Sequence, residues 1–201
     1  CEQPKEETTD GYTYYEIHNQ GQLRWFADQV NKQNRPNINA RLMESFAMDS
    51  TEWTPIGTST NPFKGTFDGD GHTITGLTCS TNAKADYVGL VGYAVDATIQ
   101  NVTVQDASLN GNEHIGAVCG YITGGTITGC TTSGGTVSGF CYLGGIAGEA
   151  QNATVQRCFN TGAVTGSYSS IGGIAGQAYD ATVQDCGNTG AVIRTGNGGN
   201  Y

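Results

Sequence analysis

The sequence predicts an all-β fold, a parallel β-solenoid of about five to six coils with one amphipathic helix that caps its amino-terminal end. Three observations support this prediction. A glycine-rich sextet recurs at a fixed interval, each interval holds short apolar runs separated by turn residues, and an amphipathic stretch precedes the repeats. Self-similarity at a fixed period is the signature of a repeat architecture.

The repeats keep their register over four units. LGGIAG at 143–148 returns as IGGIAG at 171–176, and in weaker form as IGAVCG at 115–120 and VGLVG at 88–92. The closing glycines lie 28 residues apart, at Gly92, Gly120, Gly148 and Gly176. Ten residues after these glycines come Val102, Cys130, Cys158 and Cys186. One unit cannot bury its own apolar face, so successive units are expected to stack and share a core.

Each unit is expected to contribute three short strands. The runs are of the kinds GGIAG, ATVQ and GAV, and none is long enough for a helix. Corresponding strands would pair coil on coil at about 4.8 Å. We expect the glycines to supply positive φ at the corners and close backbone approach, since both are easy for glycine.

The stretch YYEIHNQGQLRWFADQVNKQN is typical of a strand followed by a helix. Asn19 suits the N-cap, and the helix is expected to end near Asn34 because Arg35 precedes a proline. One apolar face is formed by Leu23, Phe26, Ala27 and Val30. A helix of this kind just before a solenoid is best explained as a cap over its first coil.

Four parts are predicted along the chain. Residues 1–11 form a flexible tether, 12–62 an N-terminal strand, the capping helix and an irregular lead-in, 63–85 the first coil, and 86–201 four repeats of about 28 residues. No helix or charged coil follows the last repeat. We therefore expect residues 187–201 either to fold over the last strand edge or to leave it free for edge-to-edge self-association.

Composition limits the partners. The chain of 201 residues has 31 Gly, only 13% charged residues and a net charge of −9. This balance argues against nucleic acid as a partner, because no basic stripe exists to displace counterions from phosphate. Acidic substrates such as pectin are disfavoured for the same reason.

The stretch WTPIGTSTNPFKGTFDGDGHTITGL, followed by units of the form GLVG, ATIQNV and GAVTG, resembles the GLUG-repeat proteins over roughly residues 12–193. These are bacterial cell-surface and secreted proteins, often anchored as lipoproteins. The resemblance implies a right-handed β-helix-like solenoid at the cell exterior with an adhesion or scaffold role, and it carries over no catalytic residue. One departure is that Val88 stands where later units have Gly116, Gly144 and Gly172.

The first residue is a cysteine followed by a polar, charged stretch. This arrangement resembles a mature bacterial lipoprotein, in which Cys1 would carry the lipid. The expected location is then the cell surface or outer membrane, with the chain facing outward and touching the membrane only through that lipid. The alternative is a chain boundary that falls on a cysteine by chance.

Catalytic and metal-binding patterns are weak. His18, His72 and His114 lack the HExxH spacing, and FDGDG at 67–71 is better explained by glycine-assisted turns than by a calcium loop. We expect no catalytic residues, cofactor or metal. The file of Cys130, Cys158 and Cys186 is expected to consist of buried free thiols, since in-register side chains seldom reach disulfide geometry. Asp96, Asn152 and Asp180 should form a structural column at one corner.

Binding is the function that the tyrosines favour. Tyr93 and Tyr121 begin the same turn in adjacent coils, while Tyr87 and Tyr142 lie near corners, as do Tyr168 and Tyr179. Stacked rings of this kind can bind a sugar or a protein, or simply pack. We therefore predict a non-enzymatic, adhesin-like or scaffold module that presents a glycan-binding or protein-binding surface. The alternative is a carbohydrate-active β-helix lyase or hydrolase.

Overall fold

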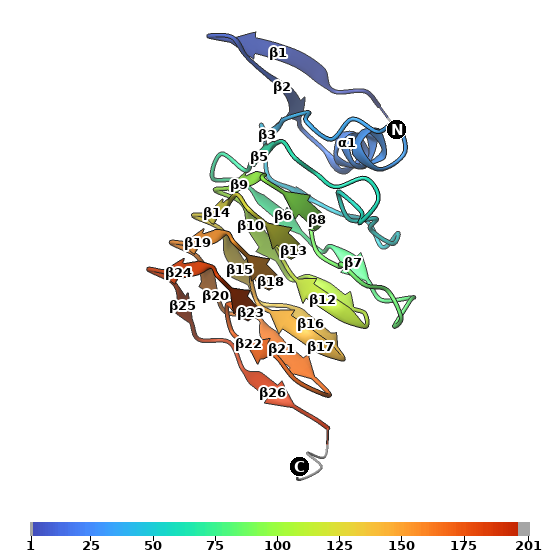
Figure 1. Ribbon diagram of the computed structural model, residues 1–201. Coiled ribbons are helices and arrows are strands. Elements are labelled where there is room, and N and C mark those ends of the chain that lie inside the picture. Colours follow the sequence, from blue (N-terminus) through green and yellow to red (C-terminus); the bar gives the residue numbers. More distant parts are fainter. Residues whose placement is uncertain (1, 197–201) are drawn as a thin grey trace.

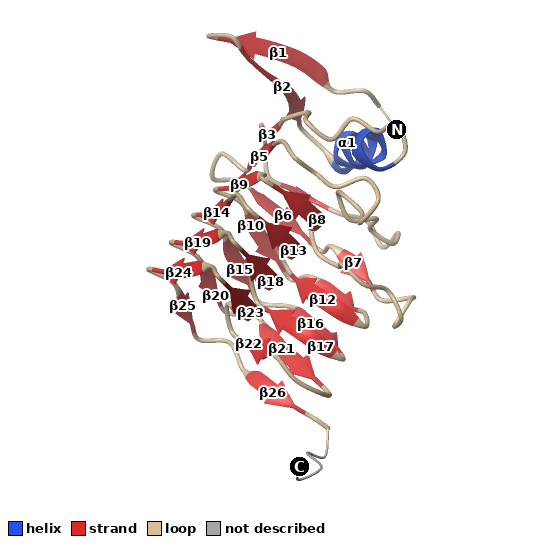
Figure 2. Cartoon of the chain, viewed as in Figure 1, coloured by secondary structure: helices blue, strands red, loops and turns tan. Residues whose placement is uncertain are grey.

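A computed structural model describes residues 2–196 as a parallel β-solenoid of about six turns, with one helix at its amino-terminal end within that range. The strands lie in layers, one coil above the next, and the helix α1 (Gln20–Asn31) lies beside the first layers (Figure 1, Figure 2). The all-β solenoid predicted from the repeats is confirmed.

The strands of the described residues form five sheets along the solenoid. The first sheet contains β1 (Lys5–Thr9), β2 (Tyr12–Ile17), β3 (Ala40–Leu42), β5 (Thr66–Asp68), β9 (Thr98–Gln100), β14 (Thr126–Thr128), β19 (Thr154–Gln156) and β24 (Thr182–Gln184). The second contains β4 (Phe46–Ala47), β6 (Thr73–Thr75), β10 (Thr103–Gln105), β15 (Thr131–Ser133), β20 (Phe159–Asn160) and β25 (Gly187–Asn188).

The third sheet contains β7 (Thr78–Cys79), β11 (Ser108–Asn110), β16 (Thr136–Gly139), β21 (Ala163–Gly166) and β26 (Val192–Arg194). The fourth contains β12 (Glu113–Gly116), β17 (Cys141–Gly144) and β22 (Ile171–Gly172). The fifth contains β8 (Val91–Val95), β13 (Cys119–Thr123), β18 (Ala147–Gln151) and β23 (Ala175–Tyr179). A repeat therefore holds five short strands, where the apolar runs predicted three.

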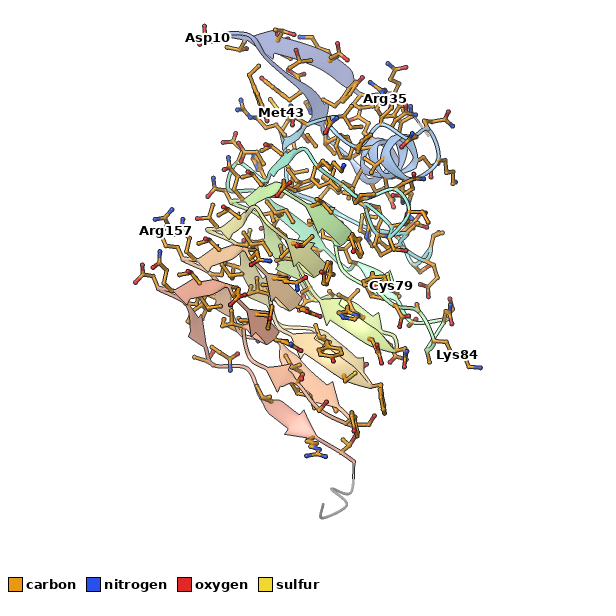
Figure 3. The ribbon with its side chains drawn as sticks, viewed as in Figure 1. Asp10, Arg35, Met43, Cys79, Lys84 and Arg157 are labelled. Carbon is orange, nitrogen blue, oxygen red and sulfur yellow. The ribbon has the colours of Figure 1, made fainter. Side chains whose placement is uncertain are left out.

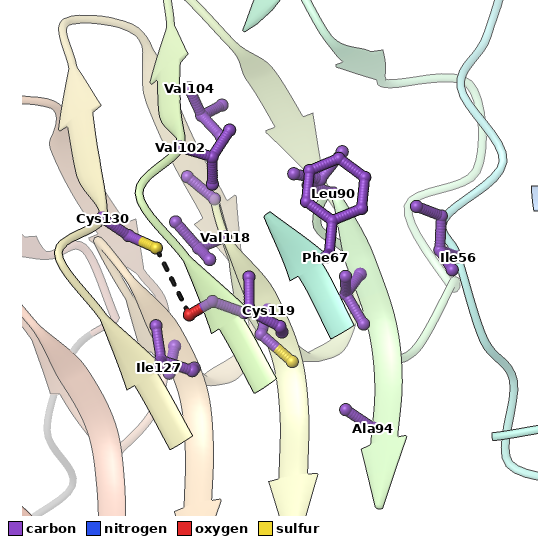
Figure 4. Packing of buried hydrophobic residues seen from close by; sticks show 14 of the residues in the cluster. Ile56, Phe67, Leu90, Ala94, Val102, Val104, Val118, Cys119, Ile127 and Cys130 are labelled. Atoms are coloured by element: carbon purple, nitrogen blue, oxygen red, sulfur yellow. Dashed lines mark hydrogen bonds between the residues drawn. The ribbon is translucent and has the colours of Figure 1, made fainter. Parts of the chain in front are cut away.

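The register follows the repeat of the sequence. Ile127 of β14 pairs with Ile99 of β9 on one side and with Val155 of β19 on the other, in parallel strands. All three side chains are fully buried in one continuous core, and Figure 4 shows Ile127 within it. One coil thus supplies a few inward residues, and the next coil covers them, so the apolar face is buried only by stacking.

Helix α1 caps this core as predicted. Its N-cap is Asn19, whose side chain accepts a hydrogen bond from the Gln22 backbone N–H at 3.0 Å. The four residues of the predicted apolar face are all buried, and Phe26 packs edge-on against Phe63, with ring centroids 6.0 Å apart. The helix ends at Asn31, earlier than predicted, since Asn34 already adopts a left-handed conformation with φ of 52°.

The prediction of a flexible tether over residues 1–11 is wrong for most of that segment. Residues 5–9 form β1, which pairs antiparallel with β2. Asp10 and Gly11 make the turn at the tip of the hairpin, with φ of 53° and 79° (Figure 3). Asp-Gly is a strong signal for a type I′ hairpin turn, and this dipeptide accounts for the hairpin. Cys1 lies outside the described residues, and its lipid stays a prediction.

The lead-in is also more regular than predicted. β3 pairs with β2 and β5, and β4 pairs with β6, while Ile56 and Phe63 form bridges to Val91 and Ala94. The first coil therefore begins near residue 40, before the predicted boundary at 63. This coil could not be recognised from the 28-residue interval, because its loops differ in length from those of the later repeats.

The carboxyl-terminal coil stacks on the one before it. β25 pairs with β20 and β26 with β21, while Val183, Val192 and Ile193 are 40%, 44% and 47% exposed. Residues 197–201 lie outside the described residues. Self-association through this edge therefore stays a prediction. Among residues 2–196, no helix has the length and apolar character needed to cross a membrane.

The thiols are stacked as predicted, and Cys130 and Cys158 are buried, whereas Cys186 in the last coil is only partly buried. The Sγ atoms of Cys130, Cys158 and Cys186 each point to a main-chain carbonyl of the preceding coil, 3.7, 3.8 and 3.7 Å away. Figure 4 shows the first of these contacts. The six cysteines from Cys79 to Cys186 are free, and burial raises the pKa of the Cys130 thiol above its usual value.

A thiol reagent should therefore discriminate among these cysteines. At pH 8 in the folded protein, we expect iodoacetamide to modify Cys186, which is partly exposed, before Cys130 and Cys119, which are fully buried. Reagents attack the thiolate, and burial keeps the two inner thiols protonated. Peptide mass spectrometry over time measures the order. Modification of Cys130 as fast as Cys186 without denaturant would contradict the buried file.

Candidate functional site

The corners of the solenoid use residues with positive φ. One corner consists of Asp96, Gly124, Asn152 and Asp180, with φ of 51°, 64°, 48° and 46°. This confirms the predicted column, and these residue types tolerate that conformation well. The second corner, at the fourth sheet, is different in composition. It consists of Tyr87, His114, Tyr142 and Ser170, with φ of 61°, 59°, 56° and 56°. A bulky side chain in this region is uncommon, and such outliers cluster at functional sites.

The rings at this corner stack on one another. The centroids of Tyr87 and His114 are 5.0 Å apart with an interplanar angle of 24°. His114 and Tyr142 are 4.7 Å apart at 11°. Stacking in register offsets part of the cost of the backbone conformation, because each ring covers the face of the next.

A second column lies beside the first. Tyr93 of β8 and Tyr121 of β13 are paired in register, with ring centroids 4.7 Å apart. The predicted tyrosine ladder is thus present as a structural feature. Glu149 of β18 occupies the same position in the next coil. Tyr121 donates a hydrogen bond from its hydroxyl to Oε1 of Gln151 at 2.6 Å.

The two columns meet in one cluster. Tyr87 packs edge-on against Tyr93 at 4.9 Å, and Nε2 of His114 lies 2.8 Å from Oε2 of Glu149. Burial raises the pKa of both Tyr87 and Tyr121. We call Tyr87, Tyr93, His114, Tyr121 and Tyr142 the aromatic corner. It brings together all four tyrosines proposed from the sequence.

The sequence reading missed His114 and Glu149. Tyr87 and His114 are 27 residues apart, one short of the repeat, which hid their equivalence. The structure pairs Val88 with Ile115, so Val88 does not stand in the place of Gly116. Gly89 lies against Gly116 instead. The apparent departure from the repeat is a shift of one residue.

The glycines of the sextet make room for this corner. A Cβ on Gly92 would lie 2.7 Å from the Tyr87 carbonyl oxygen, and one on Gly120 would lie 2.6 Å from that of His114. Neither glycine has a positive φ. The expectation that the sextet glycines supply positive φ is therefore wrong for these two, while the expectation of close backbone approach is confirmed. Turning is done by other residues, including tyrosine and histidine.

A second ring stack lies on the loops before β17 and β22. Phe140 and Tyr168 are 41% and 51% exposed, with centroids 4.9 Å apart and nearly parallel rings at 5°. Tyr179 is 54% exposed, and no stacked partner is recorded for it among residues 2–196. These rings do not belong to the aromatic corner.

These features define the class of protein: it is a parallel β-solenoid with aromatic side chains stacked along one corner. Residues 167–193 match the family described as the GLUG motif. This match supports the resemblance to GLUG-repeat proteins that the sequence indicated. The matched segment extends from the loop before β22 into β26, and coils with the same strands precede it.

Two known proteins are similar to parts of this chain. Halomucin from Haloquadratum walsbyi (strain DSM 16790 / HBSQ001) is 38% identical over 82 residues, which are 37% of this chain and 1% of Halomucin. The crystal structure of a "putative immunoglobulin A1 protease" from Bacteroides ovatus has a TM-score of 0.78 and 26% identity, over 92% of this chain and 59% of that one. The chain spans less than two thirds of either protein.

Proposed function

We propose that this chain is a non-enzymatic module of an extracellular surface protein and that it binds a glycan through the aromatic corner. The observation that carries the proposal is the stack of three rings in left-handed backbone conformations, whereas another corner with positive φ uses Asp, Asn and Gly. Aromatic side chains suit sugar rings, since they offer apolar area with a polar edge.

The surroundings of His114 support a role without catalysis. Its Nε2 contacts Glu149, its ring is covered on both sides by Tyr87 and Tyr142, and its Nδ1 is buried with no hydrogen-bond partner among the described residues. A general base must reach the proton that it removes, and this nitrogen is shielded. The Glu149–His114 pair therefore fits a structural role inside the cluster.

The match to the GLUG motif and the likeness to a stretch of Halomucin fit a repeat module at the cell exterior. The second candidate is an enzyme. The name of the Bacteroides ovatus protein describes a protease. For this chain, the enzyme that the sequence leaves as an alternative is a carbohydrate lyase or hydrolase.

One experiment separates these functions. The purified chain is applied to a printed array of neutral, amine-bearing, sialylated and sulfated oligosaccharides. In parallel it is incubated with polysaccharides, and reducing ends and unsaturated products are measured. We expect glycan binding and no turnover. Turnover would favour the enzyme, and a chain that binds no glycan would remove the proposed function, leaving a protein partner or a scaffold role.

A further inference from the structure

The stacked columns hide most of their own ring faces. In a column, each ring covers the face of the next, so the inner rings present mainly their edges to solvent. A sugar that packs on an aromatic side chain needs a ring face. The face that can receive it therefore belongs to a ring at the end of a column. If the chain binds a glycan as proposed, the glycan is therefore expected at one end of a column in the aromatic corner.

Tyr87 is the first ring of its column. His114, from the next coil, covers one of its faces. On the other side lies the preceding coil, whose Ile56 forms a bridge to Val91. A pocket of about 260 Å³ is lined by Thr54, Pro55, Gly57, Thr58 and Ser59 together with Asp86 and Tyr87. Tyr87 is itself part of this lining, so the residue borders a hollow surface where the column begins.

A second pocket of about 250 Å³ adjoins the first, because the two share Thr54, Pro55, Asp86 and Tyr87 in their lining. It extends toward Glu52 and Asn110. We call the two adjoining pockets together the Tyr87 groove. A concave site with an aromatic ring and a few polar groups is the usual form of a small-molecule site.

The charged groups of the Tyr87 groove, Glu52 and Asp86, are hydrogen-bond acceptors. Oδ1 of Asp86 accepts hydrogen bonds from Nδ2 of Asn112 and from the Glu113 backbone N–H, at 3.0 and 3.2 Å. Among the described residues, no hydrogen bond to Oδ2 of Asp86 is recorded. This oxygen can accept from a hydroxyl or an ammonium group of a ligand.

Charge selects among glycans. Glu52 and Asp86 line the groove, and neither pocket is lined by lysine or arginine. Lys84 lies nearby in sequence, but its side chain points outward at the tip of its loop (Figure 3). A carboxylate or sulfate on a ligand would meet two negative charges with no cation to pair with, which disfavours binding.

We propose that the Tyr87 groove binds one sugar ring of a glycan that carries no carboxylate or sulfate group. The sugar packs its apolar face on Tyr87 beside Pro55 and donates a hydroxyl or amine hydrogen to Asp86. The inner rings of the column hold Tyr87 in its left-handed conformation. The groove is thus the binding subsite, and the remaining rings position it.

The test compares variants on the oligosaccharide array, followed by calorimetric titration with the best-bound oligosaccharide. Tyr87→Asn removes the ring, and asparagine tolerates the positive φ at this position. Ser59→Trp fills the groove from an exposed loop position. Tyr168→Asn is the matched control, since it deletes an exposed ring that lies outside the aromatic corner.

We expect Tyr87→Asn and Ser59→Trp each to weaken binding about tenfold or more, a loss of about 1.4 kcal/mol, and Tyr168→Asn to bind like the parent chain. Bound glycans should be neutral or amine-bearing. If both groove variants bind like the parent, or if sialylated or sulfated glycans bind best, the groove is not the site, although glycan binding itself stands. A parent chain that binds no glycan overturns both proposals. Far-ultraviolet circular dichroism verifies that each variant is folded. If Tyr87→Asn is unfolded, the result for Ser59→Trp decides the test.

Discussion

Gly148→Ala is expected to lower the free energy of unfolding by about 3 kcal/mol. A Cβ on Gly148 would lie 2.5 Å from the Gly120 carbonyl oxygen and 2.5 Å from the Ile115 backbone nitrogen. Both are main-chain atoms of a neighbouring coil, so neither can move without disturbing the ladder of hydrogen bonds. The methyl group can therefore fit only if two coils separate locally. Urea denaturation followed by circular dichroism measures the loss.

The same substitution at Gly21 provides the control. Gly21 lies in the first turn of α1, and the nearest atom to an added Cβ is Oδ1 of Asn19 at 3.2 Å. Alanine is a better helix former than glycine by up to about 1 kcal/mol, so Gly21→Ala should not destabilise the chain. Equal losses from the two substitutions would show that the sextet glycines are not needed for close approach of the coils.

Asn160→Ala is expected to cost about 3 kcal/mol, because it leaves buried main-chain groups without partners. The side chain of Asn160 is fully buried. Its Nδ2 donates to the Gly162 carbonyl oxygen at 2.9 Å, and its Oδ1 accepts from the Gly162 backbone N–H at 3.0 Å. The amide also donates to Oδ1 of Asn188 in the next coil at 2.8 Å.

Asn188→Ala separates burial from hydrogen bonding. Asn188 makes the same two bonds to Gly190, at 3.0 and 3.2 Å, but its side chain is exposed. Water can replace these bonds, so we expect a loss of less than about 1 kcal/mol. Thermal unfolding of both variants measures the difference. A loss at Asn188 as large as that at Asn160 would contradict the role assigned to burial.

The strongest predictions from sequence were those that depend on a fixed interval. The spacing of the sextets gave the stacking of Ile99, Ile127 and Val155, and the apolar face of α1 gave the cap. Strands of two to five residues were harder to find, since an individual strand such as β15 buries a single side chain. The coil near residue 40 was missed because its loops do not keep the 28-residue interval.

The candidate site was predicted in part. The tyrosines were found because aromatic residues at equivalent positions stand out in a sequence rich in Gly, Thr and Ser. Their joining into one cluster could not be seen, since it depends on a left-handed conformation that the sequence does not reveal for Tyr87 or His114. The Tyr87 groove was also hidden. It depends on how the segment from Thr54 to Ser59 lies beside the next coil.

Because each coil contacts mainly its neighbours, the length of the solenoid can change without changing the binding site. Each added unit would extend the molecule along its axis by about 4.8 Å and leave the groove near α1 unchanged in its own frame. Duplication or loss of a unit in a gene for such a protein would then change how far the groove stands from the opposite end, without altering what it holds.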